Sequence, residues 1–467
     1  MSDDKIALIA HLLRRAGFGS TQSELEEFAS RDYEDVVEEL LHPERAPEID
    51  EDVVRRYYPE LNYPDALPLA SAYWVYRMVN SKRPLEEKIA LFWHHVFATA
   101  WYKSEHPGTM VRQIDIFRRV GLGDMRTILL ALSKDPGMLH WLDNCENHSD
   151  EPNENYGREL LELFSMGVGN YTEQDIKSVA RAFTGWTFDQ PIPLYPHGNY
   201  PSRFLYCEED HDTGPKTFLG QTGRFNGEDI GDIIVRQPAT ARFVSRHLYN
   251  FFVADEAQVP AWERVTPKDI RAIEVLEKAY EDSGGEIRAI LRVLFNSVFF
   301  QEARFKRVKS PAELVAGTIK LVGTFRGPEP GMEALNTATT NMGQQLMNPP
   351  TVEGWHTGRE WIDGATLNER VNFGVDQMSD PDKPGIREIV RRLSSNGGSL
   401  TPQELIDRCL DLLGPLEVDP QTREGLLEHA SSAGVLSFDG GADGNGSAAR
   451  VAAMLQLIVS SVDYQFA

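Results

Sequence analysis

The sequence has few cysteines, and no two of them are spaced as a pair. Its 467 residues include three, Cys145, Cys207 and Cys409, which lie far apart and form no Cys-x-x-Cys motif. A thiolate zinc site needs cysteine pairs, and a disulfide framework is typical of small cysteine-rich secreted chains. The cysteines therefore indicate neither kind of site and fit a reducing compartment.

Long apolar segments are also missing. No run of eighteen apolar residues occurs, so an ordinary membrane-spanning helix is excluded. The chain begins with Met1 to Lys5 and an amphipathic stretch, without the basic and then apolar order of a signal peptide. We therefore expect a soluble, cytoplasmic protein, or an exported one if a leader has been removed from the sequence.

Positive charge is scarce as well. Against 71 acidic residues stand 47 lysines and arginines, which gives a net charge of −24 at pH 7. Binding to a nucleic-acid backbone requires clustered basic side chains, so we expect no nucleic-acid partner. The acidic excess is typical of a well-solvated surface, and a surface made for cation binding is the alternative. No Walker sequence occurs and no glycine fingerprint follows a predicted strand, which leaves a nucleotide-binding enzyme little support.

Helical periodicity is what the sequence has in abundance. Apolar residues recur at helical spacing from the first residues to the last, and Thr21 with Glu24 has the pattern of a capping box. The period is lost between residues 186 and 222, where prolines, glycines and aromatics predict an irregular insertion with two or three short strands. No repeat of 20 to 50 residues is evident. The pattern predicts a mainly α fold.

The domain organisation follows from this pattern. We predict a large multi-helix single body over residues 1–467, with a helical entry module at 1–60, a motif-bearing core at 61–380 and a C-terminal helical segment at 381–467. Within it the spacing predicts three short helices in residues 4–45 and longer ones that include 69–81, 84–101 and 153–167.

The stretch from Asn153 to Gly167 is the most selective in composition, because it places amides, acids and an arginine on an apolar helix. Glu159 and Glu162 are three residues apart, so the two acids can share a helix face. This helix face could carry a functional site. Alternatively it is a buried structural network, in which Asn153 caps the helix, Glu154 pairs with Arg158, and Glu159 or Glu162 pairs with an arginine such as Arg181.

Several histidines could complete a site. His94 and His95 are neighbours in the predicted helix 84–101, and because neighbours point about 100° apart, at most one of them faces any one site. His148 lies in a loop at 143–155 whose oxygen-bearing side chains could wrap a hard cation or cap the next helix. His211 and Asp212, beside a glycine turn, could orient a proton or bind a metal, or form a plain polar turn.

Three further segments have two readings each. The glycines of Arg14 to Gly19 could let a backbone approach an anion, or could end a helix and form a turn. Met347 to Trp361 forms a rigid aromatic loop that could line a pocket or plug the core. Asp439 to Gly446 is most simply a flexible loop, despite its alternating oxygen ligands.

Six segments in this order resemble the uncharacterised bacterial family known as domain of unknown function 1800. They are Leu12–Gly19, Phe92–His95, Asn153–Phe164, Ala180–Trp186, His211–Lys216 and Pro349–Trp355. The resemblance covers nearly the whole chain and implies export and a sulfatase-like partner protein, but no activity. The chain departs from the family by starting at its first helix without a leader. It also carries His356 where a proline or a small residue is expected, which makes His356 a further site candidate.

These residues support the hypothesis of a metal-dependent enzyme, a hydrolase, whose bound water is the nucleophile. We expect Glu159 and Glu162, with His94 or His95 and also His148 and His211, to converge on one or two divalent ions of unknown identity. Asp212 would orient His211, while Lys216 or Arg158 would balance charge on a small anionic substrate. No His-Glu-x-x-His or Glu-x-x-His motif specifies the metal. A non-catalytic helical binding or scaffold protein is the competing hypothesis.

Overall fold

Helices account for most of the chain. The computed structural model describes residues 3–62, 67–104, 107–189, 202–257, 259–395, 398–438 and 446–467. These residues form 24 α-helices and three two-stranded sheets, which confirms the predicted mainly α fold. Within this part of the chain, no helix combines the length and apolar character needed to cross a bilayer. Most of the predicted loop at Asp439 to Gly446 lies outside the described residues.

The amino-terminal part contains the three short helices predicted in residues 4–45, followed by a fourth. Thr21 forms the predicted capping box, since its backbone N–H donates to the Glu24 carboxylate at 2.9 Å and its hydroxyl accepts from the Glu24 N–H at 3.3 Å. The helices are α1 (Asp3–Arg15), α2 (Gln22–Ala29), α3 (Tyr33–Leu41) and α4 (Glu51–Tyr57).

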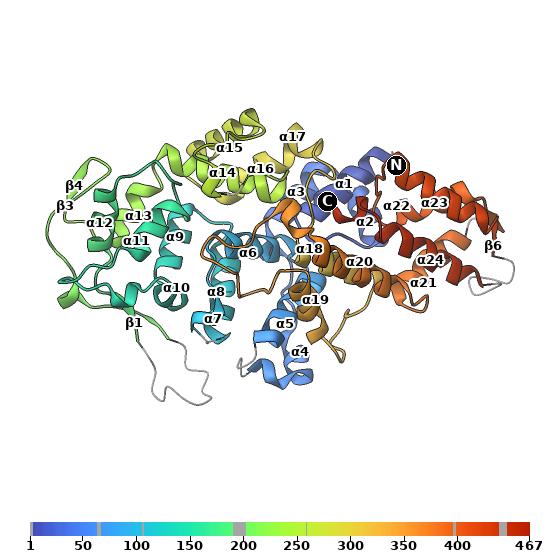
Figure 1. The fold of residues 1–467 in the computed structure, drawn as a ribbon, viewed down its shortest axis with the longest axis horizontal. Helices are drawn as coiled ribbons and strands as arrows, with labels where there is room; N and C mark the ends of the chain where they lie inside the picture. Colours follow the sequence, from blue (N-terminus) through green and yellow to red (C-terminus); the bar gives the residue numbers. More distant parts are fainter. Residues whose placement is uncertain are drawn as a thin grey trace.

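The middle of the elongated molecule is built around one helix, α6 (Pro84–Val96), which is buried on nearly all sides (Figure 1). The predicted helix 84–101 ends early, because the Trp101 N–H donates to the carbonyl of Met347 at 3.0 Å instead of continuing the helical ladder. The other helices of this region are α5 (Leu67–Asn80), α7 (Trp101–Ser104), α8 (Pro107–Val120), α14 (Pro238–Phe252), α15 (Ile270–Ser283), α16 (Ile287–Asn296), α17 (Val298–Gln301), α18 (Pro311–Val322) and α19 (Glu333–Asn341).

The left end in Figure 1 carries the predicted irregular insertion beside five helices. Two antiparallel pairs of strands form there, with Trp186 opposite Tyr206 in the first pair and Lys216 opposite Gly223 in the second. The elements are α9 (Met125–Ser133), α10 (Pro136–Trp141), α11 (Asn155–Glu162), α12 (Glu173–Ala182), α13 (Gly227–Ile234), β1 (Trp186–Phe188), β2 (Phe204–Tyr206), β3 (Lys216–Phe218) and β4 (Gln221–Gly223).

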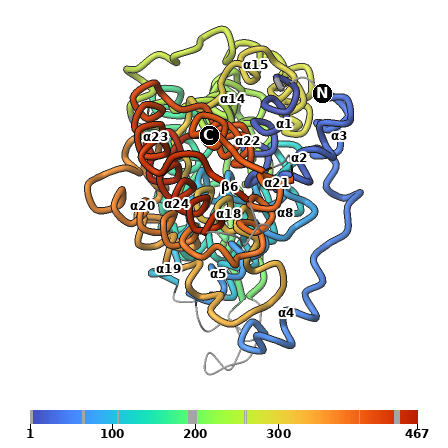
Figure 2. Tube along the Cα trace, turned by 90° about the vertical axis from the view of Figure 1, so that its right-hand side faces the viewer, coloured from blue at the N-terminus to red at the C-terminus, as the bar shows by residue number. Residues whose placement is uncertain are grey.

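The right end holds the last helices, which stand in front in Figure 2. From there the chain returns to the start of α18, where the Lys309 N–H donates to the carbonyl of Gln465 at 2.8 Å. The elements of this end are α20 (Gly364–Met378), α21 (Pro384–Ser394), α22 (Pro402–Leu412), α23 (Pro420–Ser432), α24 (Ser447–Val459), β5 (Ser399–Leu400) and β6 (Leu436–Ser437).

One connected apolar cluster runs through the molecule from Ile9 to Tyr464. Trp74 and Trp93 are among its largest fully buried side chains. The aromatic loop from Met347 to Trp361 buries both of its tryptophans, Trp355 and Trp361, which pack with Val308 in a smaller second cluster. Burial of two such large rings holds this loop, which includes Glu353, against the core.

Candidate functional site

Helix α11 carries the two acids that the sequence singled out. The Asn153 side chain accepts a hydrogen bond from the Asn155 N–H at 2.9 Å, whereas the N-cap residue is Glu154, which makes no side-chain cap. The helix is shorter than the predicted 153–167 and ends at Glu162. Beyond it the chain unwinds, because the N–H of Gly167 donates back to Leu161 and Gly167 takes a φ of +79°.

The two carboxylates of this helix have different surroundings. Glu162 accepts a hydrogen bond from the Tyr171 hydroxyl at 2.9 Å, which fixes its position. Glu159 is half-buried and has neither a hydrogen bond nor an ion pair within the described part of the chain. Burial, Glu162 and Glu353 raise the pKa of Glu159 to about 7, and Arg158 opposes this only in part. A carboxyl group with this pKa can give or take a proton near neutral pH.

Arg158 does not neutralise Glu159. Its guanidinium donates to the Glu173 carboxylate at 3.0 and 2.9 Å and to Glu154 at 3.3 Å. The expected pair of Glu154 with Arg158 is therefore present. Arg181, the expected partner of Glu159 or Glu162, binds Asp212 instead. The pair lies at the surface, with the Arg158 and Glu154 side chains 38% and 36% exposed, so it is not the buried network expected for this helix.

His94 serves a structural contact in the core. Its ring is fully buried, and Nε2 accepts a hydrogen bond from the Met347 N–H at 3.0 Å. The ring lies between Trp74 and Trp355, with centroid distances of 5.6 and 5.3 Å. Burial lowers the pKa of His94 to about 3, with His95 as a smaller cause. The neutral ring joins α6 to the aromatic loop, and Nε2 is not available to a metal.

His95 faces the same loop from its other side. Its ring stacks on Trp355 at 6.5 Å and 15°. Burial, and then Arg307, lower the pKa of His95 to about 4. The neighbouring His247 has its pKa lowered well below the usual range by burial and then by His95. His95 thus contacts the loop that bears Glu353, and the His95 and His247 imidazoles are both neutral at physiological pH.

His148 lies at the surface, away from the acid pair. Its Nδ1 contacts the Asp210 carboxylate at 2.6 Å, and that contact raises the pKa of His148. The surrounding oxygen-rich loop holds the backbone: Asn144 and Asn147 donate to the carbonyls of Trp186 and Ala180 at 2.9 and 2.8 Å. These contacts join the loop to α12 and β1, and they are neither a cap of the next helix nor a cation site.

The turn from His211 to Lys216 is a closed polar structure. His211 Nδ1 donates to the carbonyl of Thr184 at 2.9 Å, and Asp212 pairs with Arg181 at 3.2 Å and not with His211. Lys216 is 2% exposed and donates to the carbonyls of Asp212 and Gly214. Asp212 is thus paired with Arg181, and Lys216 with two backbone carbonyls, which fits the polar-turn alternative.

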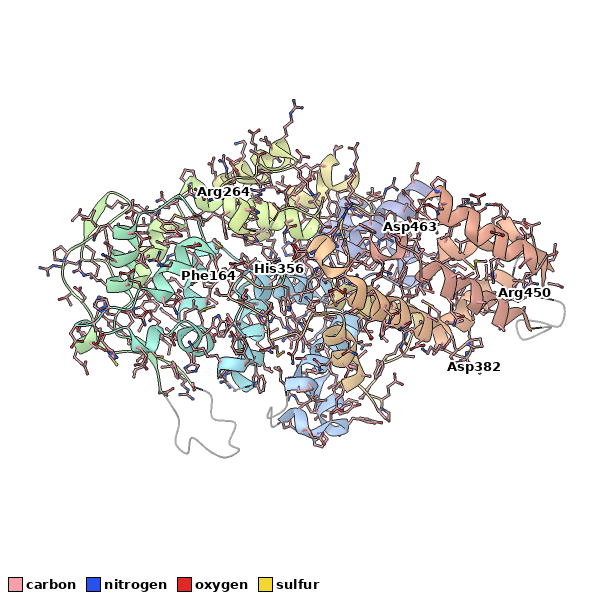
Figure 3. All side chains as sticks on the ribbon, viewed as in Figure 1. Phe164, Arg264, His356, Asp382, Arg450 and Asp463 are labelled. Carbon is pink, nitrogen blue, oxygen red and sulfur yellow. The ribbon has the colours of Figure 1, made fainter. Side chains whose placement is uncertain are left out.

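The expected convergence on a metal is not present in the described ranges, where no three histidine, cysteine or acidic side chains gather closely enough to hold an ion. The physical reason is that most candidates have other partners: Met347 for His94, Asp210 for His148, Thr184 for His211. His356, near the centre of Figure 3, forms an exposed pair with Glu360 at 2.7 Å. Of the expected ligands, Glu159 and Glu162 are neighbours on α11, and the charge of Glu353 acts on Glu159.

A buried ionic network elsewhere was missed from the sequence. Glu313, at the start of α18, accepts from Arg15 at 3.1 Å and from Arg307 at 2.8 Å, and it also binds Lys88. Its carboxylate further closes a capping box by accepting from the Ser310 N–H at 2.8 Å. The Ser310-to-Glu313 spacing could have revealed the cap. Nothing in the spacing indicates the three basic partners, which come from distant elements.

We expect Gly354→Ala to destabilise the protein and to disturb His95. Gly354 has a φ of +84°, and a Cβ there would lie 2.5 Å from the His95 carbonyl oxygen. Left-handed backbone and the clash together cost at least about 2 kcal/mol, measurable by urea unfolding. Gly364→Ala is the matched control, because Gly364 begins a helix with open space around it. Equal stability of the two variants would contradict the packing described for this loop.

Comparison with known proteins agrees with the motifs. The family model described as "Protein of unknown function (DUF1800)" matches residues 11–466, which is nearly the whole chain. No curated protein and no solved structure matches the chain. Any function must therefore be argued from the residues and contacts above.

Proposed function

The chain belongs to this family of proteins of unknown function, DUF1800, and we propose that it is a hydrolase in which Glu159 and Glu162 act as a carboxylate pair. The observation that carries the proposal is the contrast within the pair. Tyr171 holds Glu162 at 2.9 Å, whereas the half-buried Glu159 has no basic or hydrogen-bonding partner in the described ranges. A half-buried carboxyl group with a raised pKa and no partner is more typical of a functional site than of a group that serves only the fold.

The two acids would divide the work of proton transfer. With a pKa near 7, Glu159 is protonated in about half of the molecules at neutral pH and can donate a proton to a leaving group. Glu162, fixed by Tyr171, would accept a proton from the attacking water. A raised carboxyl pKa beside a second carboxylate is typical of the general acid in hydrolases.

A divalent ion is the second candidate for this site. Glu159 and Glu162 are neighbouring acids that Arg158 offsets only in part, and Mg²⁺ is commonly held by one or two carboxylates with waters and substrate oxygens. An ion bound there would lower the pKa of a water and lower that of Glu159 as well. The remaining candidates, His211, Asp212 and Lys216, would then have only a structural role.

The proposal is tested by substrate classes and matched variants. Chromogenic esters, glycosides, phosphate esters and sulfate esters are assayed with the wild type, Glu159→Gln and Glu173→Gln. We expect hydrolysis of one class, with a rate lowered about 10²- to 10⁴-fold in Glu159→Gln and little changed in Glu173→Gln, which alters an exposed partner of Arg158. Equal rates in all three proteins would exclude Glu159 from the reaction, and no hydrolysis in any of them would favour the non-catalytic scaffold.

Elemental analysis separates the two forms of the proposal. Stoichiometric metal that is lost with EDTA and with Glu159→Ala, together with a lowered melting temperature, would assign the ion to this site. Active protein that is metal-free and unaffected by EDTA would assign the reaction to the two carboxyl groups alone.

A further inference from the structure

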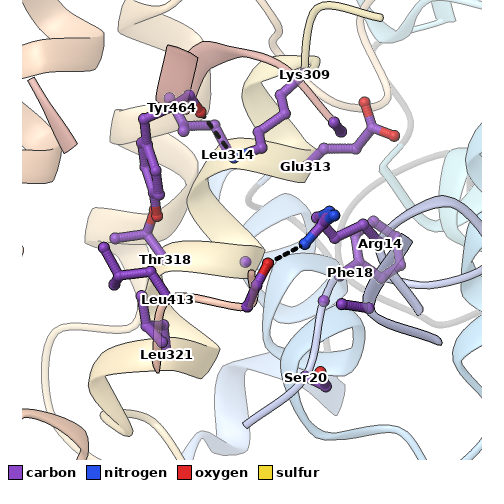
Figure 4. A pocket seen from close by; sticks show the side chains of 15 residues that line it. Arg14, Phe18, Ser20, Lys309, Glu313, Leu314, Thr318, Leu321, Leu413 and Tyr464 are labelled. Carbon is purple, nitrogen blue, oxygen red and sulfur yellow. Dashed lines mark hydrogen bonds between the residues drawn. The ribbon is translucent and has the colours of Figure 1, made fainter. Parts of the chain in front are cut away.

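A small cavity lies between the end of α1, the start of α18 and the last residues of the chain (Figure 4). Its volume is about 60 Å³. The polar side chains that line it are Arg14, Ser20, Lys309, Glu313, Thr318 and Tyr464. The acids Glu159 and Glu162 do not line it, so it is separate from the proposed hydrolytic site.

Positive charge exceeds negative charge around this cavity, in a protein whose net charge is −24. Glu313 is fully used by Arg15, Lys88 and Arg307, which leaves none of its oxygens for the cations that line the cavity. Glu417, the next acid, pairs with Arg304 at 3.8 Å. The basic side chains of the region are Arg14, Arg15, Lys88, Arg304, Arg307, Lys309 and Arg370, and the acidic ones that meet them are Glu313, Asp255 and Glu417.

Arg14, which lines the cavity, has unused donors. Its Nη1 donates to the carbonyl of Gly414, and its guanidinium carbon lies 4.8 Å from the ring centroid of Phe305. Its Nε and Nη2 atoms are buried and find no hydrogen-bond partner in the described part of the chain. Parallel N–H groups on one edge of a guanidinium form the fork that binds two oxygens of a carboxylate, phosphate or sulfate.

Lys309 adds a second cation. Its Nζ donates to the carbonyl of Tyr464 at 2.7 Å and lies 4.0 Å from the centroid of that ring, which leaves further protons of the ammonium group for another acceptor. Burial, then Arg14 and Arg370, lower the pKa of Lys309 to about 7. Burial and then Arg15 lower the pKa of Arg14 to about 10. An anion in the cavity would remove this repulsion between like charges.

The chain turns at the end of α1 and forms part of the cavity wall. The N–H of Gly19 donates to the carbonyl of Leu13 at 3.0 Å, which is the helix end and turn predicted for this segment. Gly19 has a φ of +82°, and no described atom lies within 4 Å of where its Cβ would stand. Ser20, which follows, brings a hydroxyl group to the cavity wall.

We propose that this cavity is a binding site for a small oxyanion, held by the fork of Arg14 and the ammonium group of Lys309. One water-sized group occupies about 10–15 Å³ in this measure, so the volume fits the oxygens of a single phosphate, sulfate or carboxylate group. The anion links the amino-terminal helix to α18 and to the end of the chain. Binding therefore stabilises the fold.

The test compares oxyanions with chloride at constant ionic strength. We expect phosphate or sulfate to raise the melting temperature of the wild type by about 2–4 °C at saturation, and chloride to leave it unchanged. Titration calorimetry then gives the affinity, which Arg14→Gln lowers by at least about tenfold. Lys309→Met is the second variant, in case Arg14→Gln does not fold. Arg31→Gln is the matched control, because Arg31 pairs with Glu39 at the surface.

The source of the anion is read from the purified protein. Ion chromatography of the denatured sample identifies inorganic phosphate or sulfate, and mass spectrometry identifies a larger compound that carries the same group. Either result, with the response lost in Arg14→Gln or Lys309→Met, supports the site. A melting temperature that responds equally to chloride, or a response to oxyanions that both variants keep, would overturn it.

Discussion

Glu313→Gln is expected to lower the free energy of unfolding by about 3–5 kcal/mol, because it leaves three buried cations without their shared carboxylate. Arg15, Lys88 and Arg307 converge on Glu313, and the side chains of Arg15 and Lys88 are fully buried. The three cations hold the pKa of Glu313 well below its usual range, although burial opposes them. Glutamine keeps the shape of the side chain but not its charge.

Urea unfolding at pH 7 measures this effect. The control is Glu388→Gln, which removes the exposed pairs with Arg391 and Arg392 and should change the stability by less than about 1 kcal/mol. Because the pKa of Glu313 is depressed in the folded state, its stabilising contribution is present above its unfolded pKa and is lost as the pH falls below that value. A Glu313→Gln variant as stable as the control would show that the network does not hold α1, α6 and α18 together.

Glu159→Gln is expected to have the opposite effect at alkaline pH, where it should stabilise the protein. The folded pKa of about 7 is above the usual 4.5, so ionisation of Glu159 is less favourable in the folded state than in the unfolded state. The wild type therefore loses stability as the pH rises from about 4.5 through 7. After allowance for the exposed part of the side chain, the loss is on the order of 1 kcal/mol.

The measurement is the unfolding free energy of both proteins at pH 4.5 and at pH 8. Glutamine imitates the protonated acid, so the two should be equally stable at pH 4.5 and the variant more stable at pH 8. Glu173→Gln should show no gain at pH 8, because Arg158 lowers the pKa of Glu173. Together with lost hydrolysis, a gain in stability would mark Glu159 as a strained functional group. A Glu159→Gln variant destabilised at both pH values would assign Glu159 to the framework.

Local features were predictable from neighbouring residues. The capping boxes at Thr21 and Thr172 form as the spacing indicates, because their partners are three residues away. The helical period is lost after Trp186, where the short strands form, and this loss is also visible from neighbouring residues. Helix ends were less predictable: α6 and α11 both stop early, since distant groups or a left-handed glycine take over their last hydrogen bonds.

The candidate site was predictable only in part. Glu159 and Glu162 could be paired because residues three apart share a helix face. Their neighbour Glu353 comes from a loop nearly two hundred positions away in the sequence, and the partners of His94, His148 and His211 are also far from them along the chain. A histidine in a motif looks the same in sequence whether it binds a metal or accepts from a backbone N–H, so the expected convergence could not be checked before the fold was known.

The sequence by itself determined that this is a helical, acidic chain of a recognisable family, and it identified the helix that bears Glu159. Periodicity, capping and composition are local properties, which is why they could be read directly. Only the tertiary structure decided which charges are balanced: Glu313 meets three cations, while Glu159 forms no ion pair within the described residues and two donors of Arg14 find no hydrogen-bond partner there. Burial and pairing of charges depend on what folding brings together, and spacing along the chain does not record it.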